Sequence, residues 1–138
     1  MREILFRGKR VGNGEWLYGW VTTQHKKYTG GDLLTKIQSN TFGVGEYYVD
    51  TETVGQFTGL LDKNGTKIFE GDIVRRFNSK EQEVMRYAVK WNTDCCMFVL
   101  ICEDTYLGEY DSDFTVFYGE EFEIVGNVHD NPELRKEK

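Results

Sequence analysis

The sequence predicts a mainly β fold, a small barrel or sandwich of about eight short strands with little helix. Its 15 glycines and single proline suit many tight turns between strands. Apolar and polar residues alternate with a period of two in many short segments, whereas helical periodicity is scarce. The chain length matches a single domain, which we expect to span residues 1–138. Such a domain buries about two-thirds of the surface of its unfolded chain, so it needs no disulfide or metal to fold.

The first predicted element is a hairpin over residues 3–23. Trp16, Tyr18 and Trp20 alternate on one face of its second strand. The Gly-Asn-Gly segment at residues 12–14 supplies the positive φ of a tight reversal between the two strands. We therefore expect the three rings to pack in the core or against the neighbouring strand.

Residues 24–45 carry weaker signals, and two interpretations stay open. The first part of this segment is polar, contains a Gly-Gly pair and is typical of a mobile loop. After it, either Asp32 caps a helical turn or residues 34–37 form a short strand. Extended character returns at residues 46–50 and 53–60.

The stretch FTGLLDKNGTKIFEGDIV, residues 57–74, holds glycines and an acidic cluster between apolar residues. Its Asp-Lys-Asn-Gly segment predicts a tight turn between two strands, because Asp bonds backbone amides just ahead of it and Asn-Gly tolerates positive φ. The following Gly-Asp pair predicts a second bend before a new strand. The residues assigned to these structural turns are Gly59, Asp62, Asn64, Gly65, Gly71 and Asp72.

Glu70 and Asp72 also permit a functional interpretation. Two residues apart in a strand, both carboxylates would point the same way, as a divalent-ion or acid–base site requires. Oxygen-coordinated ions recruit more ligands than these two, and the turn already accounts for one of them. We therefore expect no metal site here and no cofactor in the chain.

The second half of the chain predicts further strands. In EVMRYAVKW, residues 83–91, apolar and polar side chains alternate clearly. The run CCMFVLIC, residues 95–102, is continuously apolar and suits a central strand covered on both faces. The last strands are expected at residues 114–118 and 122–130.

The three cysteines, Cys95, Cys96 and Cys102, lie in this apolar run and are predicted to be buried thiols. Neither their number nor their spacing fits a disulfide framework or a zinc site. The N-terminus lacks the apolar segment of a signal peptide, and no apolar run approaches the ~20 residues of a membrane span. The sequence therefore predicts a cytoplasmic protein without membrane contact.

The charge balance opposes broad nucleic-acid binding. With 23 acidic and 17 basic residues the formal charge is −6, whereas phosphate backbones favour clustered Lys and Arg. Two local basic clusters, at residues 7–10 and 75–76, are interpreted as solvated strand ends.

No catalytic set is recognisable. The chain has two histidines, His25 and His129, and no nucleophile elbow, phosphate-binding glycine loop or dinucleotide fingerprint. A hydrolase that uses Glu70, Asp72 and His129 is the least favoured of three hypotheses. We therefore expect that the protein is not an enzyme.

The aromatic residues outnumber those that one core needs, and the surplus suggests anchors for a protein partner. The leading hypothesis is a non-enzymatic module that makes protein–protein contacts with an unknown partner or, as a homo-oligomer, with itself. The candidate binding residues are Tyr47, Tyr48, Trp91, Tyr106 and Tyr110.

The alternative hypothesis is a small barrel associated with nucleic acid. It requires basic residues to converge on one face beside Trp91. These residues are Arg7, Lys9, Arg10, Arg75, Arg76 and Arg86.

Three blocks of sequence together carry a family resemblance. They are MREILFRG at the start, VGQFTGLLDKNGTKIFEGDIV in the centre and FEIVGNVHDNPEL near the end. In this order and spacing they resemble the YopX family of bacteriophage and prophage proteins. The resemblance implies an SH3-like small-barrel core with an added N-terminal hairpin and loops, a phage or prophage origin, and hence the cytoplasm of a bacterial host cell. It implies no established activity and no catalytic residues.

The sequence departs from the family pattern in two places. Gly8 follows Phe6-Arg7, where an Ala-Trp pair is common in the family, and the segment from Val11 to Glu46 is individual. The resemblance therefore implies nothing about a specificity carried by that segment.

Overall fold

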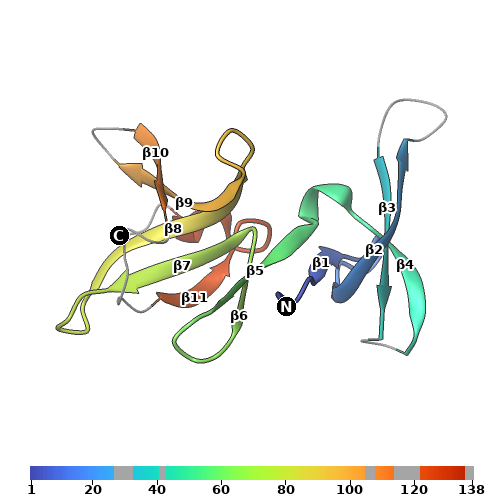
Figure 1. Cartoon of the computed structure of the whole chain (residues 1–138), viewed down its shortest axis with the longest axis horizontal. Coiled ribbons are helices and arrows are strands. Elements are labelled where there is room, and N and C mark those ends of the chain that lie inside the picture. Colours follow the sequence, from blue (N-terminus) through green and yellow to red (C-terminus); the bar gives the residue numbers. More distant parts are fainter. Residues whose placement is uncertain (27–32, 41–42, 105–107, 114–121, 136–138) are drawn as a thin grey trace. The chain divides into compact units, whose positions relative to one another are not determined.

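The structure, a computed structural model, confirms a mainly β chain made of antiparallel strands (Figure 1). The contacts divide the chain into two compact units, Met1–Phe57 (unit 1) and Thr58–Lys138 (unit 2). The expectation that residues 1–138 behave as one domain stays a prediction. The structure describes residues 1–26, 33–40, 43–104, 108–113 and 122–135.

Unit 1 is built on the expected N-terminal hairpin, which continues into an antiparallel sheet with the order β4-β3-β2-β1-β5. A strand, and not a helical turn, occupies the segment after Asp32, so one of the two open interpretations is confirmed. Residues 27–32, where the loop was expected, lie outside the described residues. The elements are β1 (Phe6–Lys9), β2 (Trp16–Lys26), β3 (Leu33–Ser39), β4 (Gly45–Val49), the 3₁₀ turn η1 (Thr51–Thr53) and β5 (Gly55–Leu61), whose first residues belong to this unit.

The core of unit 1 is formed by Leu17, Ile37 and Val49, which are almost fully buried. The sheet curls around them, because the Val11 amide donates to the Tyr48 carbonyl (3.0 Å) and so joins the ends of β1 and β4. Gly19 permits the close packing of β2 on β3, since a Cβ at this position would overlap the carbonyl oxygen of Gln38.

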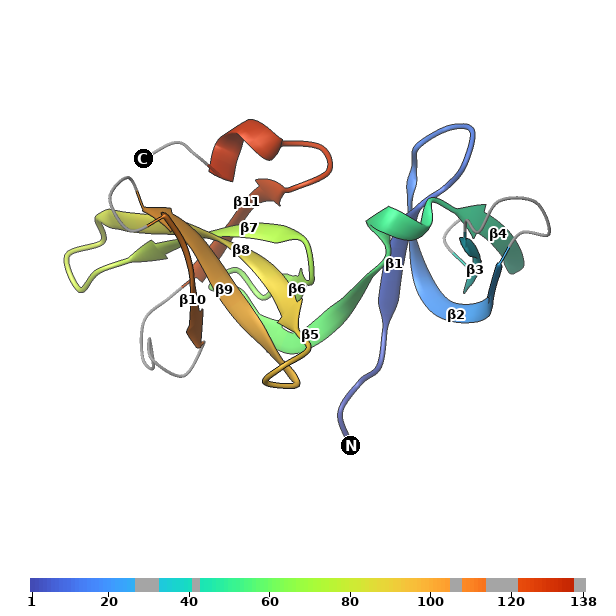
Figure 2. The ribbon, with the colours of Figure 1, turned by 90° about the horizontal axis from the view of Figure 1, so that it is seen from above.

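Unit 2 contains an antiparallel sheet with the strand order β10-β9-β8-β7-β11, preceded by the β5–β6 hairpin (Figures 1 and 2). The strand expected at residues 114–118 lies outside the described residues. The elements are β6 (Lys67–Phe69), β7 (Asp72–Phe77), β8 (Glu83–Asn92), β9 (Met97–Asp104), β10 (Gly108–Asp113), β11 (Phe122–Asn127) and the 3₁₀ turn η3 (Pro132–Arg135).

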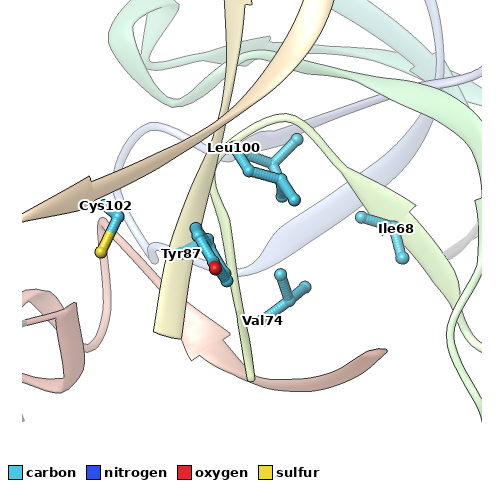
Figure 3. Packing of buried hydrophobic residues seen from close by; sticks show 6 residues of the cluster. Ile68, Val74, Tyr87, Leu100 and Cys102 are labelled. Atoms are coloured by element: carbon cyan, nitrogen blue, oxygen red, sulfur yellow. The ribbon is translucent and has the colours of Figure 1, made fainter. Parts of the chain in front are cut away.

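The core of unit 2 gathers side chains from β6, β7, β8 and β9 (Figure 3). In β9, consecutive residues from Val99 to Cys102 are all buried, as the continuous apolar run predicts for a central strand. Two sheet edges remain, because β10 and β11 do not pair with each other in the part of the chain that the structure describes. The mainly β class is therefore confirmed, while the expected small barrel is not closed.

The prediction of three buried cysteines is wrong for two of them. Cys102 is buried in β9, but Cys95 and Cys96 are exposed. Both precede the strand and lie in the turn between β8 and β9, where Cys96 has a φ of 54°. The Asn92 side-chain oxygen accepts the Cys95 amide (3.1 Å) and so stabilises the turn. The apolar character of the two cysteines did not indicate this turn, because a thiol is equally apolar in a turn and in a buried strand.

Candidate functional site

The aromatic residues of β2 share one face of the sheet, as predicted, but that face points to solvent. Leu17 and Gly19 between them are buried, whereas Tyr18 is 40 % exposed and Trp20 is 55 % exposed. Of the two predicted alternatives, packing in the core is therefore wrong for Tyr18 and Trp20, while packing against the neighbouring strand stays a prediction. Because successive strand residues face opposite ways, the close contact that Gly19 makes with β3 turns Tyr18 and Trp20 outward.

Strand β1 brings two cations to the same face. Arg7 lies opposite Tyr18, and Lys9 lies opposite Trp16, in the antiparallel register. The Arg7 guanidinium carbon is 4.7 Å from the centre of the Trp16 ring, and the Lys9 ammonium is 5.7 Å from it. Both distances are within the range of cation–π attraction, so the basic side chains are held against the aromatic one.

Strands β3 and β4 extend the surface. Lys36 lies opposite Tyr48 in the register, and its ammonium is 4.7 Å from the centre of the Tyr48 ring. Tyr48 is 47 % exposed, and the acidic Glu46 lies on the same face of β4. We call this surface the aromatic face; it consists of Trp16, Tyr18, Trp20 and Tyr48 with Arg7, Lys9 and Lys36.

The charges of the chain are divided unequally between the two units. Unit 1 contains seven basic and six acidic residues, whereas unit 2 contains ten basic and seventeen acidic residues. The acidic excess of the whole chain thus belongs to unit 2. The charge argument against nucleic-acid binding, which was made for the whole chain, does not apply to the aromatic face.

The structure does not bring the five predicted binding residues together on one strand face. Tyr48 belongs to the aromatic face, but Tyr47, its neighbour in β4, packs against the unit 1 core. Trp91, 46 % exposed, is in unit 2 and meets Phe98 edge-on with ring centres 5.1 Å apart. Tyr110 pairs with Cys102 through the backbone of β10 and β9, and Tyr106 lies outside the described residues. Their role in binding stays a prediction.

The six basic residues of the alternative hypothesis occupy different environments. Arg7 and Lys9 belong to the aromatic face, whereas Arg10 lies over the Tyr47 ring at 4.7 Å. Arg75, Arg76 and Arg86 are in unit 2. Three of the six cations belong to unit 1, which does not contain Trp91, so neither unit by itself gathers all six beside Trp91.

In unit 2, two arginines form ion pairs. Arg75 contacts Glu123 (2.8 Å) and Glu83 (3.4 Å), and the Arg86 Nε donates to Glu83 (2.6 Å). The hydrogen bond with Glu123 raises the pKa of Arg75. The hydrogen bond from Arg86 lowers the pKa of Glu83 below its usual value. These arginines are engaged by carboxylates of their own unit.

The carboxylates of the central stretch hold backbone amides. Asp62 Oδ1 accepts from the Asn64 and Thr66 amides, both at 2.9 Å, and Oδ2 accepts from the Ile124 amide at 3.2 Å. Asp72, only 2 % exposed, accepts the Phe69 amide at 2.8 Å. The turns at these residues also need glycine, since positive φ angles occur at Gly65 and Gly71. Gly59 also has a positive φ, but it lies within β5, so its assignment to a turn is wrong.

The structure brings together part of the set of residues that the third hypothesis, a hydrolase, requires. The Val128 amide donates to the Gly71 carbonyl (2.8 Å), which brings the backbone at His129 close to the Glu70–Asp72 corner. The Asp72 carboxylate, however, is buried and accepts a backbone amide there. Within the described residues, no group of three or more His, Cys, Asp or Glu side chains could hold a metal ion. The absence of enzymatic activity stays a prediction.

The exposure of the β2 rings was not predicted from the sequence. The signal was present, because Leu17 and Val21 form a second apolar set with Gly19 between them. When both faces of a strand carry apolar side chains, alternation alone does not say which face is buried.

Among the described residues, no helix combines the length and apolarity needed to cross a membrane.

Comparison with known proteins agrees with the resemblance in the sequence. The crystal structure of protein EF1440 from Enterococcus faecalis matches 99 % of this chain over 100 % of its own, with a TM-score of 0.53 and 22 % identity, a likeness that concerns the fold alone. No curated protein matches the chain. The family model described as YopX protein matches residues 5–136. Since this match covers nearly the whole chain, the protein belongs to the YopX family.

Proposed function

We propose that this protein is a non-enzymatic accessory module that associates with nucleic acid through the aromatic face of unit 1. The observation that carries the proposal is the joint presence on one sheet face of the exposed rings of Tyr18, Trp20 and Tyr48 and of the half-buried cations Lys9 and Lys36. Rings offer flat surfaces to bases, and cations neutralise phosphates. The distribution of charge supports the proposal, because the acidic excess lies in unit 2 while unit 1 has seven basic and six acidic residues.

The test is fluorescence anisotropy of labelled single-stranded and duplex probes at low salt, using the full chain. Lys36→Glu reverses a charge on the aromatic face, and Lys90→Glu makes the same change at an exposed position of unit 2. We expect Lys36→Glu to weaken binding and Lys90→Glu to leave it nearly unchanged. If the wild-type chain binds neither probe, or if the two variants behave alike, the proposal fails.

Protein–protein contact is the second candidate function. It is supported by exposed apolar side chains in unit 2, namely Leu60, Leu61 and Trp91, because Trp in particular forms interface anchors. Sedimentation of the wild-type chain and of Trp91→Ala tests the form in which the partner is a second copy. A concentration-dependent dimer that Trp91→Ala weakens would support it, and a monomer at all concentrations would exclude self-association.

We also place the protein in the cytoplasm of a bacterial host, as a phage or prophage product. Three cysteines that form no disulfide support the compartment, because reducing conditions keep cysteines in the thiol state. Membership of the YopX family supports the origin. The genes that flank its own in the parent genome test this origin, since a chromosomal neighbourhood without phage genes would contradict it.

A further inference from the structure

We infer that the aromatic face binds single strands, by stacking unpaired bases on Trp20 and Tyr18, and that it does not bind duplexes. This inference rests on the proposed function and adds the class of nucleic acid to it. Three observations support it: the spacing of the rings along β2, their exposure, and the positions of the cations on both sides.

The spacing of the rings suits an extended strand. Residues two apart in β2 lie about 6.7 Å from each other along the strand and point the same way. Trp16, Tyr18 and Trp20 therefore form a row, and sheet faces that present two or three aromatic side chains stack a similar number of bases. Trp16 is half-buried and has the Arg7 guanidinium 4.7 Å from its ring centre, whereas Tyr18 and Trp20 are 40 % and 55 % exposed, so these two rings are the platforms.

The cations lie on both sides of this row. Lys9 and Arg7 belong to β1, the neighbour of β2 on one side, and Lys36 belongs to β3, its neighbour on the other side. Arg7 is only 6 % exposed, so the phosphates of a single strand that follows β2 would meet Lys9 along one edge and Lys36 along the other. Each phosphate that is neutralised contributes about 0.7 to the slope of log K against log salt for single strands.

Duplexes are a poor match for the same face. Their bases are already stacked on one another, and stacking on a protein ring requires bases that are splayed out. The aromatic face is a sheet surface and carries no recognition helix that could enter a major groove, since unit 1 has only the short 3₁₀ turn η1 in its described part. Binding by this surface is therefore restricted to unpaired nucleotides and depends little on their sequence.

The experiment measures the affinity of the full chain for a labelled oligothymidylate of about ten nucleotides, a size in the range of known single-strand sites. A duplex of equal length is the comparison. We expect the single strand to bind more tightly than the duplex, and Trp20→Ala to weaken its binding by about five- to a hundredfold, the range measured for the loss of one base–aromatic stack. Trp20→Phe keeps a ring and should retain most of the affinity.

Val84→Ala is the control, because it shortens an exposed apolar side chain of unit 2 that belongs to none of the proposed binding surfaces. It should leave the affinity unchanged, and far-UV circular dichroism should show that each variant is folded. A second measurement uses the tryptophan fluorescence of Trp91→Phe, in which Trp16 and Trp20 are the remaining indoles. We expect the single strand to quench this fluorescence, since stacked bases contact the rings directly.

The outcomes separate the inference from the proposed function. If the duplex binds at least as tightly as the single strand, or if Trp20→Ala binds like the wild type, the inference is wrong and association with nucleic acid still stands. If neither probe binds, both fail. A loss of affinity in Val84→Ala equal to that in Trp20→Ala would place the binding surface elsewhere and would also overturn the inference.

Discussion

Replacing Asp62 by alanine removes an acceptor that holds three backbone amides in unit 2. Two of them, from Asn64 and Thr66, belong to the turn that follows Asp62. The third, from Ile124, lies 62 residues further along the chain in β11. The same turn makes a backbone bond to β11, from the Lys63 amide to the Phe122 carbonyl (2.8 Å). The carboxylate thus joins local and long-range structure.

Asn78 provides a matched reference, because its side chain makes the same two local bonds. Its oxygen accepts from the amides at the second and fourth following residues, Lys80 (2.9 Å) and Gln82 (3.0 Å), but both bonds are exposed. A typical hydrogen bond contributes about 0.5–1.5 kcal/mol net, and one to a charged group about 1.5–3 kcal/mol. We therefore expect Asp62→Ala to lower the free energy of unfolding by about 4 kcal/mol, and Asn78→Ala to lower it by about 1 kcal/mol.

Asp62→Asn separates the long-range bond from the local ones. Asparagine keeps one side-chain oxygen for the turn amides, while its NH₂ group cannot accept from the Ile124 amide. We expect this variant to lose about 1–3 kcal/mol, between the wild type and Asp62→Ala. Because the total stability of a domain is only about 5–15 kcal/mol, differences of this size are measurable.

Urea unfolding followed by circular dichroism measures the three variants against the wild type. The midpoint should fall in the order Asn78→Ala, Asp62→Asn, Asp62→Ala, with an unchanged dependence of the free energy on urea. Equal shifts for Asn78→Ala and Asp62→Ala would refute the reasoning. The bond to Ile124 would then contribute nothing beyond a surface turn, and the burial of the carboxylate would have no energetic consequence.

Four further predictions concern packing, exposure, charge and cooperativity. Gly19→Ala should destabilise the protein by about 3 kcal/mol in urea unfolding, because the added Cβ would overlap backbone atoms of β3. Gly8→Ala should destabilise it less, since its Cβ would meet a side-chain atom of Ile37 at 3.1 Å. An equal loss of stability in both variants would contradict this reasoning. Trp20→Ala should change the melting temperature little, and a large decrease would mean that the ring is not exposed in solution. Glu83→Gln should lower the free energy of unfolding by about 0.5 kcal/mol near neutral pH. The folded pKa of Glu83 lies below its usual 4.5, so this contribution is present above pH 4.5 and is lost as the pH falls through the lower folded value. A cost that persists in acid would be inconsistent with the ion pair. Finally, the wild-type chain should unfold in one urea transition, and two separate transitions would show that the units fold independently.

Much of the fold was predictable from the sequence, because its signals are local. A hairpin needs only two alternating segments and a turn that tolerates positive φ, and both the N-terminal hairpin and the β5–β6 hairpin satisfy this. The amide-binding role of Asp62 was predictable for the same reason, since its turn partners are two and four residues away. The bond to Ile124 was not, because nothing in the sequence near Asp62 indicates which distant strand will lie beside the turn.

The sequence by itself determined the strand-rich class, the family and the shared face of Trp16, Tyr18 and Trp20, since the two-residue period of a strand is a property of the backbone. Only the tertiary structure decided that this face is exposed, that Arg7, Lys9 and Lys36 lie on it, and that Cys95 and Cys96 leave the core. These features depend on which strand pairs with which and on how closely the strands approach. Both are set by the packing of residues far apart in the chain, as the contact between Gly19 and β3 illustrates.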